Sequence, residues 1–521
     1  SLAPLPMVHP GTVVRAGGRL VEGVRRHLSR TAATAAAAAA GPTSGPRASS
    51  ELNWDHDVTV VGGGVVGAAA AIRLAESSIF QGSNIGVVET RPPPGLEEAL
   101  SPATPPDVRT YAMTPGSEKF LRSLGVWQLL EEAERLQPYS AMQIWEWGGD
   151  GYMRFDSHNH APHEQQHLGT IVENRALQAA LFHRLKELEA NGRVTLYCPA
   201  QVASMSFPTA PRGDPNSPIG PARLRLVSEG MDLDLTSRLV LAADGAKSPT
   251  RQAAGIPTWG WGYGQKAVVA TVELQQHTDT AWQRFIRSGP IAILPLKGPY
   301  ASIVWSTDTA EANHLAKLSD TDFVKALNGA LAAPSEPFAS QYLPTPFAMV
   351  DSLLATASRA ARLTGDQAFE SAPEVCAVAS RRFALDLSLS QARTYTGNRL
   401  CLLGDAAHTV HPLAGQGLNL GLGDAEHICE VIEAAARAGT DIGSPQHLIS
   451  YEHTRKLANL QMMALLDGIH RLFAVEPGPL RWLRNTGMSV LNAAPPVKSQ
   501  VVKFAMGGAG GTRKNSSPAA P

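Results

Sequence analysis

The residues with the clearest chemical potential follow an apolar strand near the C-terminal end of the chain. The strand Leu400–Leu403 runs into Gly404 and Asp405, and a Gly/Pro/Ala loop and a helix start come next. A carboxylate there can accept hydrogen bonds from sugar hydroxyls, and a helix N-terminus directs N–H groups and a positive dipole at a negative group. This predicts a binding site for a cofactor that becomes negatively charged during turnover, as a reduced flavin does. The residues expected to contact it are Gly404, Asp405, Pro412, Gly415, Gly417, Leu418 and Asn419.

A second candidate turn lies near the N-terminus. Val58–Val61 has the pattern of a buried parallel strand, and Gly62, Gly64 and Gly67 then form a Gly-x-Gly-x-x-Gly motif that opens a helix. In dinucleotide-binding folds these glycines permit a tight turn, close approach to a pyrophosphate and close helix packing, in that order. The next apolar strand ends in Glu89, about 20 residues on, where a carboxylate binds the adenosine ribose. A glycine triplet alone also fits any tight turn, but this context favours dinucleotide binding.

A third block repeats the pattern of a strand that ends at an aspartate. Leu239–Ala243 runs into Asp244 and Gly245, and Ser248 and Arg251 follow at a spacing of three residues. An ordinary Asp-Gly turn is the commonest meaning of such a dipeptide, so this block alone does not decide between a turn and a binding site.

The order of the three blocks resembles that of the group A flavoprotein aromatic hydroxylases, which have the p-hydroxybenzoate hydroxylase fold. The closer resemblance is to the ubiquinone-biosynthesis hydroxylases, whose last block is similar to residues 404–419 here. Segments 108–117 and 172–178 also resemble that subfamily, and the similarity runs from about residue 57 to residue 504. One departure is Ala384, because the subfamily usually has proline at this place. The loss of a fixed φ angle leaves that loop, expected near the ring and the substrate, less constrained.

The resemblance implies FAD as the cofactor and assigns residues to it. Arg109 and Arg175 would lie near the cofactor, with Arg175 the better candidate for the pyrophosphate. Asp405 would bind the ribitol, and Asp244 would lie near the phosphate region of the flavin. No catalytic base is named, because the two histidines of the last block, at positions 408 and 411, fit equally well as hydrogen-bonded structural groups.

The resemblance also implies a reaction. In the family, reduced flavin and O2 give a C4a-hydroperoxide that transfers oxygen to an electron-rich ring, and the protein positions the reactants and keeps water out. The subfamily's substrates are polyprenylated phenols such as 4-hydroxy-3-polyprenylbenzoate, hydroxylated at C5 on the way to ubiquinone. Its electrons come from NADPH through ferredoxin reductase and ferredoxin, and other ubiquinone-synthesis proteins are expected partners in a complex.

The expected fold class is α/β, with a Rossmann-like FAD-binding lobe, an interleaved antiparallel-sheet substrate lobe and C-terminal helices. The 521-residue chain exceeds the usual size of a single core, which also favours two lobes. The predicted division is a leader at 1–50; the FAD-binding lobe at 55–140, 239–258 and 398–440; the substrate lobe at 141–238 and 259–390; C-terminal helices at 441–506; and a disordered tail at 507–521.

Hydrophobic periodicity places the elements that must position these residues. Apolar residues at 177, 181 and 185 predict a helix over 174–190 that packs on the FAD-binding lobe. Further helices are expected in 116–136, split near Gly125, and over 417–438, 451–472 and 480–491. Strands are expected at 142–147, 194–198, 222–227, 266–273, 292–296 and 302–307, and four of these should build the substrate sheet.

Net charge and the placement of histidines and cysteines restrict the classes of ligand and partner that the chain can bind. The formal net charge of −1 argues against a nucleic-acid partner. The histidines at 158, 160, 163 and 167 lie in a polar run without metal-ligand spacing, so no metal site is predicted. The four cysteines are far apart in sequence, which favours buried free thiols in a reducing compartment.

The first fifty residues differ from the rest. They contain six arginines against the single acid Glu22, and residues 31–40 are almost all alanine. Such a leader is typical of an organelle transit peptide, and a low-complexity tail is the alternative. The family resemblance favours the mitochondrion, on the matrix side of the inner membrane. No apolar run is long enough to span a bilayer, so no spanning helix is predicted. The apolar polyprenyl tail of the family's substrates implies peripheral access from a membrane surface. Leu480–Arg484 mixes basic and apolar residues as interfacial helices do, but it fits a helix packed on the FAD-binding lobe equally well.

Three functions stay open from the sequence. The first is the ubiquinone-pathway monooxygenase, which the segment 172–178 and the full block 404–421 favour. The second is a related flavin epoxidase or reductase acting on another lipid. The third is a non-catalytic flavoprotein scaffold, against which the intact Asp244 and Asp405 argue.

Overall fold

The structure is a computed structural model of the chain. It describes residues 54–149, 151–157, 167–209, 219–334, 369–411, 415–474 and 478–492, together with positions 356, 498 and 500. The predicted leader at 1–50, Pro412, most of the polar histidine run and the predicted tail at 507–521 lie outside the described residues.

The first sheet is built around parallel strands. Its order is β18-β19-β11-β1-β2-β8, and the β9–β10 pair continues from β11. Its central strands β1 and β2 are almost wholly buried, as expected for apolar runs of a parallel sheet. The strands are β1 (His56–Val61), β2 (Ile85–Val88), β8 (Val194–Tyr197), β9 (Gln201–Ser206), β10 (Ala222–Ser228), β11 (Met231–Ala242), β18 (Thr396–Gly397) and β19 (Leu400–Leu402).

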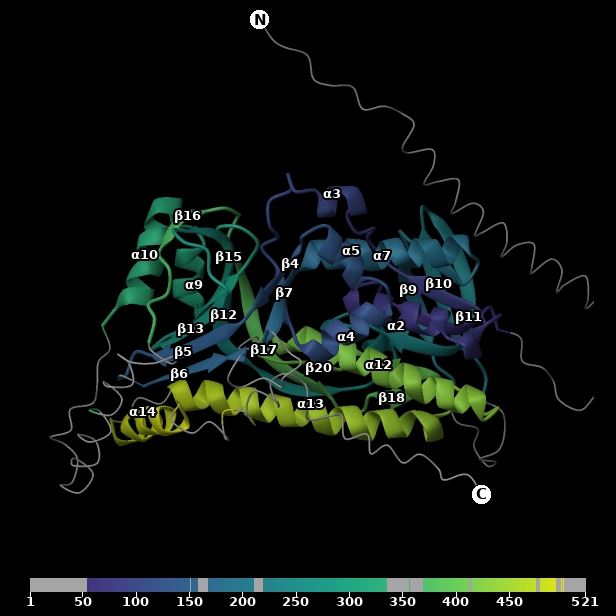
Figure 1. Ribbon diagram of the computed structural model, residues 1–521. Coiled ribbons are helices and arrows are strands. Elements are labelled where there is room, and N and C mark those ends of the chain that lie inside the picture. The colour runs from purple at the N-terminus through teal and green to yellow at the C-terminus, as the bar shows by residue number, and fades with distance from the viewer. Residues whose placement is uncertain are drawn as a thin grey trace, which may run out of the picture.

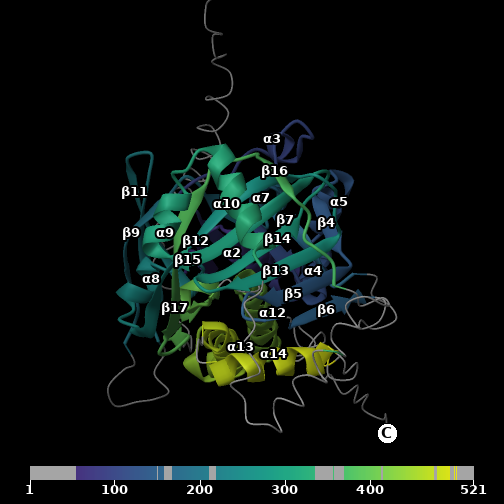
Figure 2. The same cartoon turned by 90° about the vertical axis from the view of Figure 1, so that its left-hand side faces the viewer.

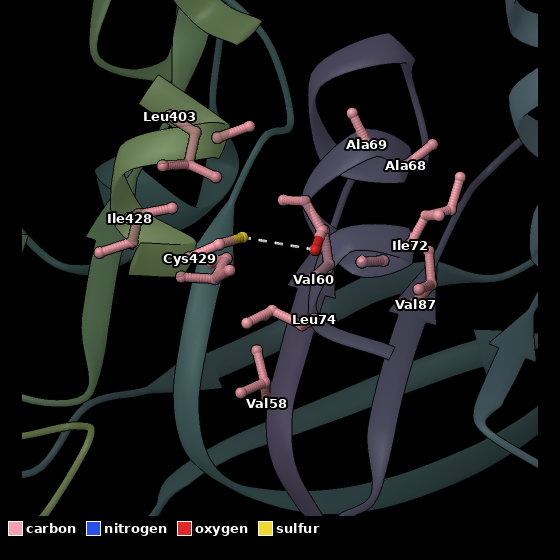
Figure 3. Close-up of a cluster of buried hydrophobic side chains, with 14 of the residues drawn as sticks. Val58, Val60, Ala68, Ala69, Ile72, Leu74, Val87, Leu403, Ile428 and Cys429 are labelled. Atoms are coloured by element: carbon pink, nitrogen blue, oxygen red, sulfur yellow. Dashed lines mark hydrogen bonds between the residues drawn. The ribbon is translucent and has the colours of Figure 1, made fainter. Parts of the chain in front are cut away.

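Helices pack closely on this sheet because their contact faces carry small residues. The flanking helices are α2 (Val65–Glu76), α7 (Asn174–Ala190) and α12 (Gln416–Arg437). Ala68 and Ala69 of α2 are fully buried near Val60, and Ile428 and Cys429 of α12 lie beside this helix (Figure 3). The Cys429 thiol lies 3.6 Å from the backbone oxygen of Ala70, so the two helices are almost in backbone contact.

The second sheet is larger and mostly antiparallel. Its order is β20-β17-β12-β15-β14-β13-β5-β6, with β16 paired to β12. Its strands are β5 (Ala141–Glu146), β6 (Tyr152–Asp156), β12 (Thr258–Leu274), β13 (Thr280–Ile286), β14 (Gly289–Pro295), β15 (Tyr300–Asp308), β16 (Val375–Val378), β17 (Phe383–Ala392) and β20 (His408–Thr409). Helices α9 (Thr309–Leu315) and α10 (Asp320–Ala332) cover one face of this sheet (Figure 2).

The remaining elements join the two sheets. A three-stranded sheet has the order β3-β7-β4. It contains β3 (Thr110–Met113), β4 (Leu136–Tyr139) and β7 (Gly169–Glu173), and beside it are α3 (Leu96–Leu100), α4 (Pro115–Ser123) and α5 (Trp127–Glu132). The helices α13 (Pro445–Ala474) and α14 (Gly478–Asn492) run along one side of the molecule (Figure 1). Short elements are η1 (Ser78–Phe80), α8 (Pro249–Ala253) and η3 (Gly404–Ala406).

Most predicted elements are confirmed. The helix predicted at 174–190 is α7 with the same bounds, and α12 and α14 begin and end within two residues of the prediction. Helix α13 begins six residues earlier than expected, at Pro445, which is tolerated in a first helical turn because no donor is lost there. The strands that the sequence does not predict are β3, β4, β6, β7, β9, β13, β16, β17, β18 and β20. The first half of β12 is also missed, because it reads Trp-Gly-Trp-Gly-Tyr-Gly and glycine weakens a strand signal.

Two expectations need correction. The predicted division places residues 194–238 in the substrate lobe, whereas β8 pairs with β2 and β10 with β11, so these strands extend the first sheet. The cysteines were expected to be buried thiols, which holds for Cys401 and Cys429. Cys198 is only half-buried, and Cys376 is exposed because its strand β16 lies off the main path of the sheet.

Candidate functional site

A cavity of about 1430 Å³ lies where the two sheets, β3 and the C-terminal helices meet. Ligand pockets usually measure about 300–1,000 Å³, so this central cavity can take more than one small molecule. Its lining is mostly apolar. Eight of the predicted site residues line it: Gly64, Arg109, Gly245, Gly404, Asp405, Gly415, Gly417 and Leu418.

The first turn of the site has the geometry of a dinucleotide-binding turn. Gly62 has φ +100°, and a Cβ atom there would lie 2.4 Å from the backbone oxygen of Ala243. A Cβ atom on Gly67 would lie 1.9 Å from the Gly62 oxygen, so only glycine allows α2 to pack this closely. Gly64, in contrast, has nothing within 4 Å of its Cβ position and faces the cavity. Its backbone is therefore open to an approaching phosphate.

Glu89 stands beside this turn. Its carboxylate accepts hydrogen bonds from the backbone N–H groups of Gly63, at 2.7 Å, and Arg91, at 2.9 Å. Two carboxylate oxygens can accept more than two hydrogen bonds, so capacity remains for sugar hydroxyls. Glu89 lies outside the cavity lining, at the end of β2.

The Asp-Gly block is tied to the Gly-Asp block by an arginine. The Arg251 guanidinium donates to the backbone oxygen of Ala406 at 2.7 Å and to that of Ala246 at 2.9 Å. Asp244 accepts from the Thr250 N–H through one oxygen, while its other oxygen is buried without a partner among the described residues. An orphaned buried carboxylate oxygen is costly, and a hydroxyl group of a cofactor would satisfy it by donating a hydrogen bond.

The Gly404–Asp405 turn directs a carboxylate into the cavity. The Gly404 N–H donates to Asp424 at 3.0 Å, which holds the turn against α12. The Asp405 side chain lines the cavity, and burial raises the pKa of its carboxyl above the ordinary value. Helix α12 begins directly after Gly415, and Gly417 and Leu418 of its first turn line the cavity. The positive end of this helix therefore faces the cavity.

Of the remaining predicted site residues, some line the cavity and others lie outside it. Arg109 lines the cavity, whereas the Arg175 guanidinium lies outside the lining and donates to the backbone oxygen of Pro105 at 3.0 Å. The geometry therefore favours Arg109 over Arg175 as a cation for the cofactor. The Asn419 amide donates to the backbone oxygen of Ala112 at 2.8 Å and accepts from the Thr114 N–H at 3.1 Å. It joins α12 to the end of β3.

The two histidines of the last block have structural surroundings. His408 is fully buried, and its Nε2 lies 2.6 Å from Asp424. Burial disfavours the Asp424 carboxylate, but the positive charges of His408 and Arg455 outweigh this effect and lower its pKa. His411 packs edge-on against Tyr263, away from the cavity lining, and burial lowers its pKa to about 4.

Several cavity residues were missed by sequence reasoning. Tyr111 lines the cavity, donates to Asn174 at 3.0 Å and has its pKa raised to about 12 by burial. Gln283 and Ser302 come from strands of the second sheet, and Arg484 comes from α14. No local motif marks these positions. The alternation of Thr280–Ile286 between two faces is the only signal that could have pointed to Gln283.

The residues present fit FAD. The open backbone at Gly64, the orphaned oxygen of Asp244 and the start of α12 at the cavity suit the pyrophosphate, the polar linker and a ring that gains negative charge. A family model described as an FAD binding domain matches residues 371–465, which include the Gly404–Asp405 turn.

The fold is that of FAD-dependent aromatic monooxygenases. The crystal structure of p-nitrophenol 4-monooxygenase PnpA from Pseudomonas putida matches with a TM-score of 0.62 and 17% identity, covering 88% of this chain and 99% of that chain. The chain is 35% identical over 465 residues to the mitochondrial ubiquinone biosynthesis monooxygenase COQ6 of Danio rerio, covering 88% of this chain and 91% of the relative. The identity to the Homo sapiens protein of the same name is 35% over 490 residues, covering 92% and 99%. The chain belongs to this family of ubiquinone biosynthesis monooxygenases, and the resemblance predicted from its motifs is confirmed.

Proposed function

We propose that this protein is an FAD-dependent monooxygenase that hydroxylates the aromatic ring of a polyprenylated phenol during ubiquinone biosynthesis. The observation that carries the proposal is the central cavity, in which the flavin-type turns open into a large apolar chamber. A flavin ring occupies only part of this volume. The apolar remainder suits a ring with a long hydrocarbon tail, because burial of apolar surface drives binding.

When bound and reduced by two electrons, FAD would supply the oxygen chemistry, in which one atom of O2 enters the ring and the other leaves as water. The protein itself positions the reactants, stabilises charge on the cofactor and keeps water out of the cavity. The start of α12 stabilises negative charge on the flavin, and the apolar walls exclude water that would divert the reaction to hydrogen peroxide. The attacked position is proposed to be C5 of a 4-hydroxy-3-polyprenylbenzoate.

The predicted contacts are proposed as the FAD site. Glu89 would bind the adenosine ribose, Arg109 the pyrophosphate with a lesser part for Arg175, Asp244 the linker and Asp405 the ribitol. The backbone contacts proposed for the cofactor are Gly62, Gly64, Gly67, Gly245, Gly404, Pro412, Gly415, Gly417, Leu418 and Asn419. The domain division given from the sequence is retained as a proposal, with residues 194–238 moved to the FAD-binding lobe in line with their strand pairing.

Partners and location follow from the same proposal. We propose electron delivery through ferredoxin and ferredoxin reductase, association with other ubiquinone-synthesis proteins, and peripheral contact with the matrix side of the mitochondrial inner membrane. Relatives with mitochondrial names support the mitochondrion. Among the described helices, none combines the length and hydropathy needed to cross a bilayer. Leu480 and Leu483 of α14 are 50% and 58% exposed at the cavity, which supports entry of the tail from a lipid surface.

Complementation tests this function. The chain should restore ubiquinone synthesis in a mutant that lacks the ring hydroxylase, with the accumulated intermediate identified by mass spectrometry. Asp405→Ala should lose the rescue and reduce the FAD content, because it removes the carboxylate that opens into the cavity. Asp232→Ala, at an exposed position of β11, is the matched control and should rescue normally.

Two outcomes would reject the proposal. A folded protein that takes up no FAD would reject the cofactor site. Bound FAD that never reacts with O2 after reduction would favour a non-catalytic scaffold, and a different lipid product would favour an epoxidase or reductase.

A further inference from the structure

The cavity wall formed by the strands from β12 to β6 of the second sheet is apolar except at two positions, whereas the neighbouring strands β17 and β20 add Asp386, Ser388 and Thr409 to the lining. On β5, β6, β12, β13, β14 and β15 the only polar side chains in the lining are those of Gln283 and Ser302. The small residues Ala267, Ala281 and Ala292 lie on the same wall, so little side-chain bulk projects from it there. Two polar groups on such a wall are costly unless something bonds to them.

Gln283 is directed into the cavity by the alternation of its strand. Ala281 and Phe285 share its face, whereas Trp282 belongs to the hydrophobic cluster on the opposite face. The Gln283 side chain is only 6% exposed, and its amide has no hydrogen-bond partner among the residues that the structure describes. A buried amide can make up to four hydrogen bonds, so the group is available to a ligand in the cavity.

Ser302 provides a second polar point. Its hydroxyl accepts a hydrogen bond from the Thr110 hydroxyl at 2.9 Å, and Thr110 lines the cavity too. The two hydroxyls carry two protons and share one hydrogen bond between them. One hydroxyl proton therefore remains for an acceptor in the cavity.

The strand register sets the separation of the two points. Gln283 opposes Ala292, which opposes Val304, and Ser302 lies two residues from Val304 on β15. With strands about 4.8 Å apart and a rise of about 3.4 Å per residue, the two Cα atoms lie about 12 Å apart. A benzene ring with oxygen substituents on opposite sides spans about 6 Å, so with a hydrogen bond of about 2.8 Å at each end it bridges side-chain polar atoms about 12 Å apart, a separation of the same order as that of the two Cα atoms.

We propose that Gln283 and the Ser302–Thr110 hydroxyl pair form a polar subsite that binds the oxygen substituents of the substrate's aromatic head group. By fixing the ring at two edges, this subsite selects the ring carbon that receives oxygen. The inference rests on the proposed function and adds the residues that orient its substrate. Gln283 and Ser302 lie on the second sheet, apart from the first-sheet turns proposed for FAD, so they are assigned to the substrate.

Binding of short-tailed phenols to the FAD-loaded protein tests the proposal. The probes are 4-hydroxy-3-prenylbenzoate, the same ring without the hydroxyl group and the same ring without the carboxylate, measured by equilibrium dialysis. Gln283→Leu should weaken binding of the full probe about 3- to 10-fold, the usual effect of one hydrogen bond. For the analogue that lacks the substituent bound by Gln283, the loss should disappear. Ser302→Ala should show the same pattern with the other analogue.

Two controls separate a positioning role from a structural one. Gln137→Leu makes the same chemical change on β4, outside the cavity lining, and should bind all probes as the unchanged protein does. The affinity for FAD should stay within about 2-fold in every variant, and hydrogen peroxide formed per hydroxylated product should rise in Gln283→Leu.

The outcomes are distinguishable. Equal weakening of all three probes, or a loss of FAD affinity in Gln283→Leu, would overturn the subsite, as would unchanged binding of the full probe. Failure of the unchanged, FAD-loaded protein to bind any of these phenols would instead reject the proposed function.

Discussion

Two aspartates of the last block show how surroundings assign roles at the scale of single residues. Asp405 opens into the cavity, and burial raises its pKa although the positive charges of His408 and Arg109 oppose the rise. Asp424 is fully buried, and His408 and Arg455 hold its pKa below the ordinary value. The first carboxylate is available to a ligand, while the second is already saturated by protein donors. Only the first is therefore a candidate for cofactor binding.

His411 should make the folded protein sensitive to acid. It is 1% exposed, neither ring nitrogen has a hydrogen-bond partner in the described parts of the chain, and burial together with His470 lowers its pKa to about 4, despite the opposing charge of Asp467. The unfolded chain binds this proton near pH 6.5, so stability is lost as the pH falls from 6.5 towards 4. Between pH 7 and pH 5 the free energy of unfolding should fall by about 2 kcal/mol because of His411.

Urea unfolding at pH 7 and pH 5 measures this contribution. His411→Phe should retain the aromatic packing and lose less stability between these two pH values than the unchanged protein does. His453→Phe, at an exposed position of α13, is the matched control and should leave the pH dependence as it was. An equal loss in His411→Phe and the unchanged protein would show that His411 is not the responsible group.

At the scale of elements, a buried polar network joins α12, α13 and the Gly-Asp turn. Asp424 of α12 accepts from Gly404 N–H, from His408 and from the Arg455 guanidinium of α13 at 2.8 Å. Asn459 adds a longer contact at 3.3 Å. Because the Asp424 carboxylate bonds to both the turn and α13, removing its charge should affect the geometry of the turn and the stability of the fold together.

Asp424→Asn should therefore destabilise the protein and weaken FAD binding. The substitution leaves the Arg455 guanidinium without its counter-ion, and removal of one partner from a buried ion pair costs about 3–5 kcal/mol. Urea unfolding of the apoprotein gives the stability, and fluorescence titration with FAD gives the affinity. Glu430→Gln, at a half-exposed position of the same helix, should change neither by much. A loss below about 1 kcal/mol would contradict the predicted role of the network.

The way in which each element positions its residues explains which parts of the site could be predicted from the sequence. The turns at Gly62, Asp244 and Asp405 carry local motifs, so their meeting at one cavity follows from the parallel strands before them. Gln283 and Ser302 could not be predicted, because each is one residue in a strand whose facing direction depends on pairing with distant strands. Arg175 was favoured over Arg109 from motif likeness alone. The structure directs only Arg109 into the cavity, because the Arg175 guanidinium is bonded to Pro105.

At the scale of the whole molecule, the C-terminal helices close one side of the cavity. Sequence left open whether Leu480–Arg484 faces a lipid surface or packs on the FAD-binding lobe. In the structure α14 packs on β6 of the second sheet instead, and Arg484 is buried against Glu146. The leucines of the same helix remain half-exposed at the cavity. An apolar cavity that opens between such leucines suits a ligand delivered from a bilayer.

Replacement of these leucines should weaken vesicle binding and spare the FAD site. Burial of two half-exposed leucines in a lipid surface is worth about 2 kcal/mol, so Leu480→Ser with Leu483→Ser should lower the affinity for anionic vesicles about 30-fold. Vesicle sedimentation measures the affinity, and visible absorbance reports the bound FAD. Met231→Ser removes an exposed apolar side chain from β11 in the first sheet and should bind vesicles normally. Equal binding by the double variant would place the membrane contact on another face, and the substrate tail would then have to enter the cavity by another route.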